Sequence, residues 1–248
     1  MLDDVFPDLN PPHHAAPLKH KAAVTVFCMG ASGYFPHRVR AHERVGSGAW
    51  SPMNEGNHAW RYYDQWPPAS AQGCRLVLQS RGRLVRTKEA VDDGAGGDSF
   101  TWDPAQPTPT LGGATFSAFS SGPAENSSLE ARADTIVYTT APSQHDVDFA
   151  GFVVLRVWLW STALSADVWA RLSLVDPRDQ ASVSILDGIA RCTLDANGET
   201  WPRLVQVKLG NICAQVARGW RLRVTIAGGS FPQFSRNLGA LLLRPGDC

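Results

Sequence analysis

A chain of 248 residues, of which 44% are hydrophobic and 19% charged, is long enough to bury a substantial core, and this composition excludes wholesale disorder. The 23 basic and 23 acidic side chains cancel to a formal charge of zero, so we expect neither nucleic acid nor an anionic membrane as the main partner. The length suits one large all-β domain or two small domains.

The first 21 residues predict a tail or linker, followed by one domain over residues 22–248. The start, MLDDVFPDLNPPHH, is acidic and proline-rich and lacks the order of a secretory signal. No apolar run approaches the roughly 20 residues that span a bilayer, so we expect a soluble, cytoplasmic protein. The five cysteines form no C-x-x-C pair and favour reduced structural thiols over disulfides or a zinc site.

From Ala22 onwards the signals are those of short β-strands. AAVTVFCMG predicts a strand, Ala31–Asn57 has no clear period and predicts a long inserted loop, and RLVLQS with GRLVRT predicts a hairpin. Further strands are expected in DTIVYTTAP, FVVLRVWLW, DVWARLSLVD, ASVSILDGIARC, RLVQVKLG, WRLRVTIAGG and GALLLRP. Many short strands without a long amphipathic helix indicate an all-β sandwich or barrel.

The strand FVVLRVWLW is apolar on both of its faces. Alternation places the even-numbered residues from Val154 to Trp160 on one face and the odd-numbered residues from Val153 to Leu159 on the other. Such a strand is typically covered on both sides. We expect one face in the core and the other under a long loop or against another protein, with an exposed aromatic binding surface as the alternative.

Six motifs in order, between Val24 and Asn237, resemble the C-terminal domain of the cocaine esterase and X-Pro dipeptidyl-peptidase serine hydrolases. They are WRYYDQWPP, FTWDPAQPTPTLGG, LEARADTIVYTTAP, GFVVLRVWLW with DVWARL, LDGIAR and SFPQFSRN. The resemblance implies a jelly-roll β-sandwich of the galactose-binding-like kind, in agreement with the strand pattern.

In that family the domain follows an α/β-hydrolase domain, is itself non-catalytic, and packs against the hydrolase. The hydrolase cleaves esters or amides through a serine, a histidine and an aspartate. This sequence has no G-x-S-x-G elbow, and the glycines of MGASGY have the wrong spacing for one. We therefore expect no catalytic residues, cofactor or metal, and a stand-alone accessory domain whose partner is an α/β-hydrolase domain in trans or a second copy. Whether the family substrate is an ester or a peptide stays open.

The sequence departs from the family pattern at three places. The inserted loop Ala31–Asn57 replaces a short link. The chain ends in GALLLRPGDC, so the last strand is expected to be lost, which leaves an exposed sheet edge. Ser235 stands where the family usually has an aspartate.

Other polar residues are better explained by loops, turns and chance than by metal binding or catalysis. The histidines of the tail and loop, His13, His14, His20, His37, His42 and His58, lack regular ligand spacing. Three pairs or segments predict β-turns rather than calcium loops: Asp176–Pro177, Asp187–Gly188 and Asp195–Gly198. His145, Asp146 and Asp167 are taken as a chance set rather than parts of a triad.

The candidate surface residues are Trp60, Arg61, Trp66 and Trp201, because the tryptophans stand beside prolines or charges outside regular strands. We favour a patch that meets a hydrolase domain. One alternative is a module that binds carbohydrate or another small ligand, since jelly rolls often serve as lectin domains. A second alternative is a repurposed enzyme with a new site in the sandwich or at a dimer interface.

Overall fold

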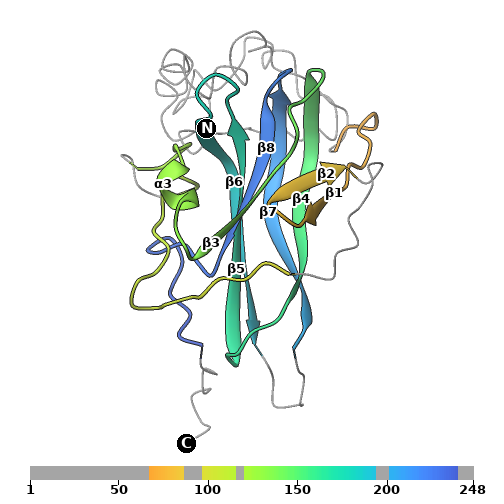
Figure 1. The fold of residues 1–248 in the computed structure, drawn as a ribbon. Helices are drawn as coiled ribbons and strands as arrows, with labels where there is room; N and C mark the ends of the chain where they lie inside the picture. The colour runs from red at the N-terminus through yellow and green to blue at the C-terminus, as the bar shows by residue number, and fades with distance from the viewer. Residues whose placement is uncertain (1–66, 87–96, 116–119, 194–200, 240–248) are drawn as a thin grey trace, which may run out of the picture.

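The computed structural model describes residues 67–86, 97–115, 120–193 and 201–239, which form a β-sandwich with one short helix (Figure 1). In chain order the elements are β1 (Leu76–Gln79), β2 (Arg83–Arg86), α3 (Ser127–Glu130), β3 (Thr135–Thr139), β4 (Val147–Leu159), β5 (Ser165–Val175), β6 (Ser182–Thr193), β7 (Arg203–Val216) and β8 (Arg221–Ala227).

The strands form two sheets, which confirms the predicted sandwich. The large sheet has the order β1-β2-β3-β8-β5-β6, and the small sheet pairs β4 with β7. All neighbouring strands are antiparallel except β2 and β3, which run parallel. Figure 1 shows the long strands of both sheets running side by side along the length of the molecule.

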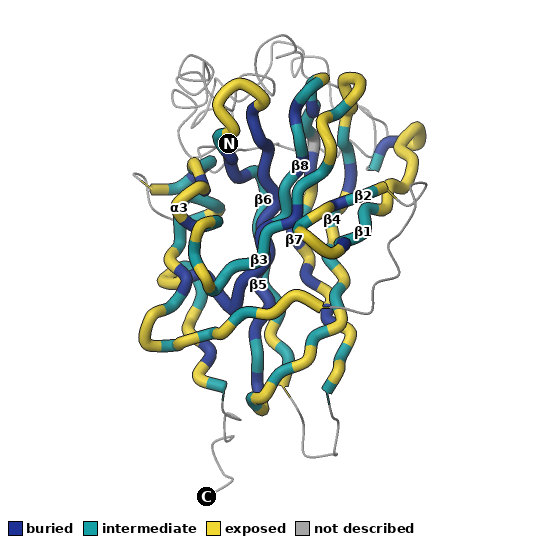
Figure 2. The backbone as a smooth tube through the Cα atoms, viewed as in Figure 1, coloured by how far each residue is buried: buried dark blue, intermediate teal, exposed yellow. Residues whose placement is uncertain are grey.

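The core lies between the two sheets and follows the alternation of the strands. β5 turns Val168, Ala170, Leu172 and Leu174 towards it, and all four are buried. From the opposite sheet β7 contributes Val205, Val207 and Leu209, and the odd-numbered face of β4 packs against the same cluster. β5 is buried along nearly its whole length (Figure 2), because the face that points away from the core is covered as well. The burial of these apolar side chains is the main stabilising contribution in a sandwich.

The predicted hairpin of β1 and β2 is confirmed. Its tip contains Arg81 and Gly82, both with positive φ, 61° and 67°. A Cβ at position 82 would lie 2.7 Å from the Val137 carbonyl oxygen, so this position requires glycine.

β6 and β7 approach each other closely at Gly188. A Cβ there would lie 2.3 Å from the carbonyl oxygen of Lys208. The predicted β-turn at Asp187–Gly188 is therefore wrong: both residues lie inside β6, and the glycine serves backbone contact rather than chain reversal. The turn at Asp176–Pro177 is confirmed, with the Gln180 N–H donating to the Asp176 carbonyl at 3.0 Å.

The outer face of the large sheet carries a buried polar layer, by which we mean Asn126, Asp167, Arg171, Asp187 and Asn237. Its centre is the guanidinium of Arg171, which is 0% exposed. Arg171 Nη1 donates to the Leu111 carbonyl at 2.6 Å and to Asn126 Oδ1 at 2.9 Å, and Nη2 donates to Asp187 Oδ2 at 2.8 Å. A charge so deep in the protein is tolerated because it is paired and hydrogen-bonded.

A second ion pair joins Asp167 of this layer to Arg191 on the neighbouring strand β6, and the C-terminal segment is attached to it. Arg191 donates from Nε and Nη2 to the two carboxylate oxygens of Asp167, both at 2.8 Å. These hydrogen bonds raise the pKa of Arg191 above its ordinary value. Asn237 Nδ2 also donates to Asp167, at 2.7 Å, and the Asn237 carbonyl accepts from Trp102 Nε1 at 2.8 Å. Residues far apart in the sequence are thereby held on β5.

Some predicted elements differ from the structure or lie outside it. β4 begins already at Val147 and β7 continues to Val216, beyond the predicted runs, because polar residues and Gly210 interrupt the apolar pattern there. The short helix α3 was not predicted. The expected strand AAVTVFCMG and the inserted loop Ala31–Asn57 lie outside the described residues. The expected strand GALLLRP does as well, apart from Gly239, which is not in a strand.

Within the described ranges, no helix combines the length and the apolar character needed to cross a bilayer. Cys74 and Cys192 are free thiols.

Gly188→Ala is expected to lower the free energy of unfolding by about 1–3 kcal/mol, because the new Cβ would force the backbones of β6 and β7 apart. Urea denaturation followed by tryptophan fluorescence measures the change. Gly73→Ala is the matched control, since a Cβ at position 73 meets nothing within 4 Å, and its effect should stay within about 0.5 kcal/mol. Equal losses in both variants would contradict the close approach of the two strands.

Candidate interaction surface

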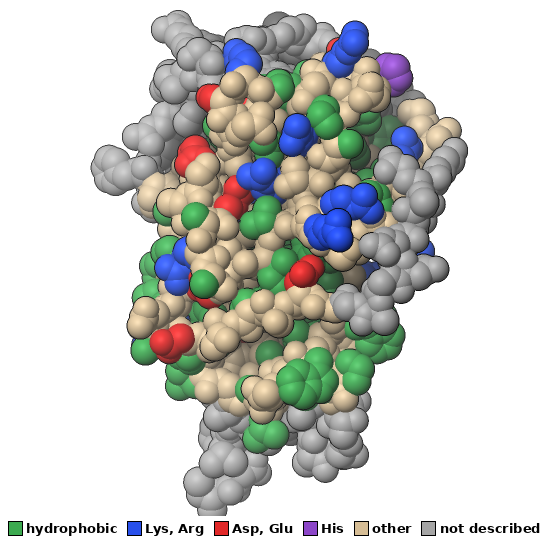
Figure 3. Space-filling model, in the orientation of Figure 1, with side chains coloured by type: hydrophobic (Ala, Val, Ile, Leu, Met, Phe, Trp, Pro, Cys, Tyr) green, Lys and Arg blue, Asp and Glu red, His purple; other side chains and the backbone are tan. Residues whose placement is uncertain are grey.

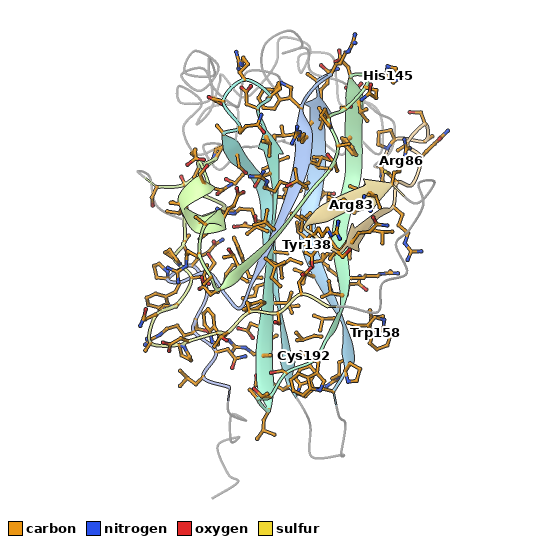
Figure 4. All side chains as sticks on the ribbon, viewed as in Figure 1. Arg83, Arg86, Tyr138, His145, Trp158 and Cys192 are labelled. Atoms are coloured by element: carbon orange, nitrogen blue, oxygen red, sulfur yellow. The ribbon has the colours of Figure 1, made fainter. Side chains whose placement is uncertain are left out.

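The outer face of β4 is an exposed apolar stripe. Alternation along the strand turns Phe152, Val154, Arg156 and Trp158 away from the core, while their odd-numbered neighbours pack into it. Phe152 is 63% exposed and Trp158 is 72% exposed, values that are unusual for side chains of this size. Figure 4 shows Trp158 extending outwards beside the lower end of β4.

For FVVLRVWLW the expected core face is confirmed, whereas cover of the other face by a long loop or by another protein stays a prediction. Its odd-numbered face packs into the core, as predicted. On the even-numbered face, Trp158 and Trp160 remain 72% and 67% exposed. This exposure agrees with the alternative of an exposed aromatic surface, because Trp158 near the end of β4 and Trp160 just after it do not contribute to the core.

The two strands of the small sheet differ in the chemistry of their outer faces. β7 presents Gln206, Lys208 and Asn211 next to β4, and all three are polar and exposed. The exception is Leu204, which is the register partner of Trp158 and is itself exposed. The apolar stripe thus follows β4 and broadens to both strands only at the end that carries Trp158.

Apolar side chains gather at that end, which we call the aromatic end: Trp158, Trp160, Leu164, Trp201 and Leu204. Trp201 Nε1 donates to the Ala163 carbonyl at 3.0 Å, and this bond ties the start of β7 to the connection between β4 and β5. Figure 3 shows hydrophobic side chains collected at the lower end of the visible face. The stripe and the aromatic end together form one continuous apolar surface along β4, with Arg156 as the charge within the stripe.

Of the four predicted surface residues, Trp201 lies in the aromatic end and is half-buried. Trp60, Arg61 and Trp66 lie outside the described residues. Sequence reasoning did not single out Phe152 or Leu204. The signal for Phe152 was present in the alternation of FVVLRVWLW, since it shares the parity of Trp158, whereas Leu204 becomes notable only through its cross-strand pairing.

A cavity of about 230 Å³ opens beside the polar layer and is the alternative location for a small ligand. It is lined by Asp167, Ile189, Arg191, Phe234 and Ser235. Its two charged groups are paired with each other, and the Ser235 carbonyl accepts a further bond from Arg191 at 3.3 Å. A ligand would have to break these contacts, so we favour the apolar surface of β4 as the functional one.

In the ranges that the structure describes, no three His, Cys, Asp or Glu side chains come together in a way that would hold a metal ion. Asp167, one of the chance set of triad-like residues, is engaged with Arg191 and Asn237. His145 lies at the opposite end of the molecule from Trp158 (Figure 4).

Comparison with known proteins gives consistent matches. The family model described as X-Pro dipeptidyl-peptidase C-terminal non-catalytic domain matches residues 50–243. The cocaine esterase of Rhodococcus sp. (strain MB1 Bresler) is 26% identical over 198 residues, which cover 73% of this chain and 34% of the esterase.

Two solved structures share the fold. An aminopeptidase from the marine sediment archaeon Thaumarchaeota archaeon has a TM-score of 0.62 at 22% identity, over 77% of this chain and 34% of its own. An α-amino acid ester hydrolase has a TM-score of 0.64 at 19% identity, over 76% of this chain and 36% of its own. The chain spans about a third of the length of each of these relatives.

Trp158→Ser is expected to change the free energy of unfolding by no more than about 0.5 kcal/mol, because the ring contributes little to the core. Trp220→Ser, at a tryptophan that is 5% exposed, should cost about 3–5 kcal/mol. Chemical denaturation of both variants measures the difference. A large loss from Trp158→Ser would show that this ring is packed rather than exposed.

Proposed function

Because the chain belongs to the X-Pro dipeptidyl-peptidase C-terminal non-catalytic domain family, we propose that it serves as the accessory domain of a serine hydrolase and contacts the catalytic α/β-hydrolase domain through the outer face of β4. The chemistry of ester or peptide hydrolysis then belongs to the partner domain. The accessory domain contributes a rigid surface that positions the partner.

The lengths of the relatives support this division of labour. This chain corresponds to about a third of the cocaine esterase and of the archaeal aminopeptidase, so each of these proteins contains a larger portion that has no counterpart here. The sequence contains no G-x-S-x-G elbow, which agrees with a catalytic serine located in such a portion.

The observation that carries the proposal is the apolar stripe on β4. A sheet face that displays Phe152, Val154 and Trp158 to water is costly unless another surface covers it. Aromatic residues near the centre of a protein interface commonly supply most of the binding energy, and polar residues lie at the rim, as those of β7 lie beside the stripe. The stripe therefore has the composition of a protein interface.

The exposed tryptophans also favour a second candidate function, the binding of carbohydrate. Indole rings stack on the apolar faces of sugars, and two exposed tryptophans lie two residues apart here, Trp158 near the end of β4 and Trp160 just after it. If sugars bind there, tryptophan emission of the wild type should shift on addition of glycans, and Trp158→Ser should abolish the shift. Unchanged emission across a glycan panel removes this candidate.

The proposed partner can be identified by its reactivity. When the chain is used as bait in an extract of its own cells, we expect it to retain a protein that a fluorophosphonate labels at a serine. Trp158→Ser should reduce the retained label at least about tenfold, as truncation of a central interface residue typically does. The bait itself should remain unlabelled.

Phe231→Ser provides the control, because Phe231 is 40% exposed and lies in the segment after β8 rather than on β4. This variant should retain the labelled protein as well as the wild type does. Equal retention by all three baits, or the absence of any labelled partner, would contradict an interface on β4. Labelling of the bait would contradict a non-catalytic role.

A further inference from the structure

Three buried polar atoms in one small region of the outer face of the large sheet have no hydrogen-bond partner among the described residues. They are Trp169 Nε1, Arg171 Nε and Thr225 Oγ1. The three residues are all 0% exposed. Buried polar side-chain atoms in folded proteins nearly always have a partner from the protein or from ordered water, so a group of three requires an explanation.

The strand register makes these three residues neighbours. Arg171 on β5 is the register partner of Thr225 on β8, and Trp169 lies two residues along β5 on the same face. The guanidinium carbon of Arg171 lies 4.9 Å from the centroid of the Trp169 ring. The unpartnered atoms thus belong to one contiguous group of side chains under the covering segments.

Three of the side chains around these atoms offer no hydrogen-bonding group. The register partner of Trp169 on β8 is Ala227, and that of Thr225 on β3 is Val137. Leu129 of α3 packs in the same buried cluster as Trp169 and Ala227. These three neighbours have apolar side chains.

The remaining nitrogens of Arg171 are already engaged. Nη1 binds the Leu111 carbonyl and Asn126, and Nη2 binds Asp187. Nε is therefore the nitrogen of this guanidinium that has no hydrogen-bond partner among the described residues. The indole N–H of Trp169 is likewise a donor only, whereas the hydroxyl of Thr225 can donate or accept.

We propose that a single internal water molecule is bound here as part of the fold. It accepts from Arg171 Nε and Trp169 Nε1 and donates to the hydroxyl oxygen of Thr225. Three hydrogen bonds are the usual number for a buried water. The charge of Arg171 is already balanced by Asp187, with which it forms a buried ion pair, so the site favours a neutral acceptor over a halide.

A high-resolution crystal structure of the wild-type chain tests the proposal directly. The expected result is a fully occupied solvent peak about 2.7–3.2 Å from at least two of the three atoms. Crystals grown with bromide in place of chloride should show no anomalous signal at this peak. A bromide signal would overturn the proposal in favour of an anion site. Density without a peak, with the three atoms bonded to other protein groups, would also overturn it.

Thr225→Val provides the solution test, because valine keeps the shape and the β-branch of threonine but loses the hydroxyl. In the wild type, the indole N–H of Trp169 should show a magnetisation-transfer signal to a long-lived water, and Thr225→Val should weaken or remove it. Thr108→Val is the matched control, since the buried hydroxyl of Thr108 donates to Asp134 Oδ2 at 2.7 Å and should leave the signal intact. An equal signal in all three proteins would overturn the role assigned to Thr225, and the lack of a signal in the wild type would overturn the bound water itself.

Discussion

The buried guanidinium of Arg171 is the interaction around which one side of this sandwich is organised. A cation that is 0% exposed must find its hydrogen-bond partners in the protein, and it finds them in three separate parts of the chain: the carbonyl of Leu111, Asn126 just before α3, and Asp187 on β6. These contacts hold the segments that cross the large sheet in place. The hydrogen bonds that offset the desolvation of the charge thus also fix the positions of connections that have little regular structure.

The outer faces of the two sheets differ in both polarity and exposure. The outer face of the large sheet is polar, and the chain covers it with α3 and with the segments around Leu111 and Asn237. The outer face of β4 is apolar and displays Phe152 and Trp158. A single chain that buries its polar face and exposes its apolar one is understandable if the apolar face has a partner. The accessory role that we propose for this non-catalytic domain would supply such a partner.

Sequence patterns were sufficient to predict where most strands lie, but not which strand faces are buried, exposed or in contact with another strand. Alternation and turn residues located most strands of the described ranges, and the motif order correctly identified the family. The failures share one cause, the dependence on contacts distant in sequence. The pair Asp187–Gly188 is typical of a turn, but it lies in β6, where Gly188 contacts the backbone of β7. The sequence placed Trp158 on an apolar face without showing that this face is exposed, since exposure depends on what the rest of the chain covers.

The central claim is that the outer face of β4 is a protein interface, and photo-crosslinking in the producing cell tests it most directly. A photoreactive p-benzoylphenylalanine in place of Trp158 reacts with whatever lies against the stripe, and mass spectrometry then identifies the adduct. The account predicts a crosslink from position 158 to an α/β-hydrolase domain, with no such crosslink from position 231 as a control. If position 158, like position 231, gave no crosslink to another protein, the account would be contradicted.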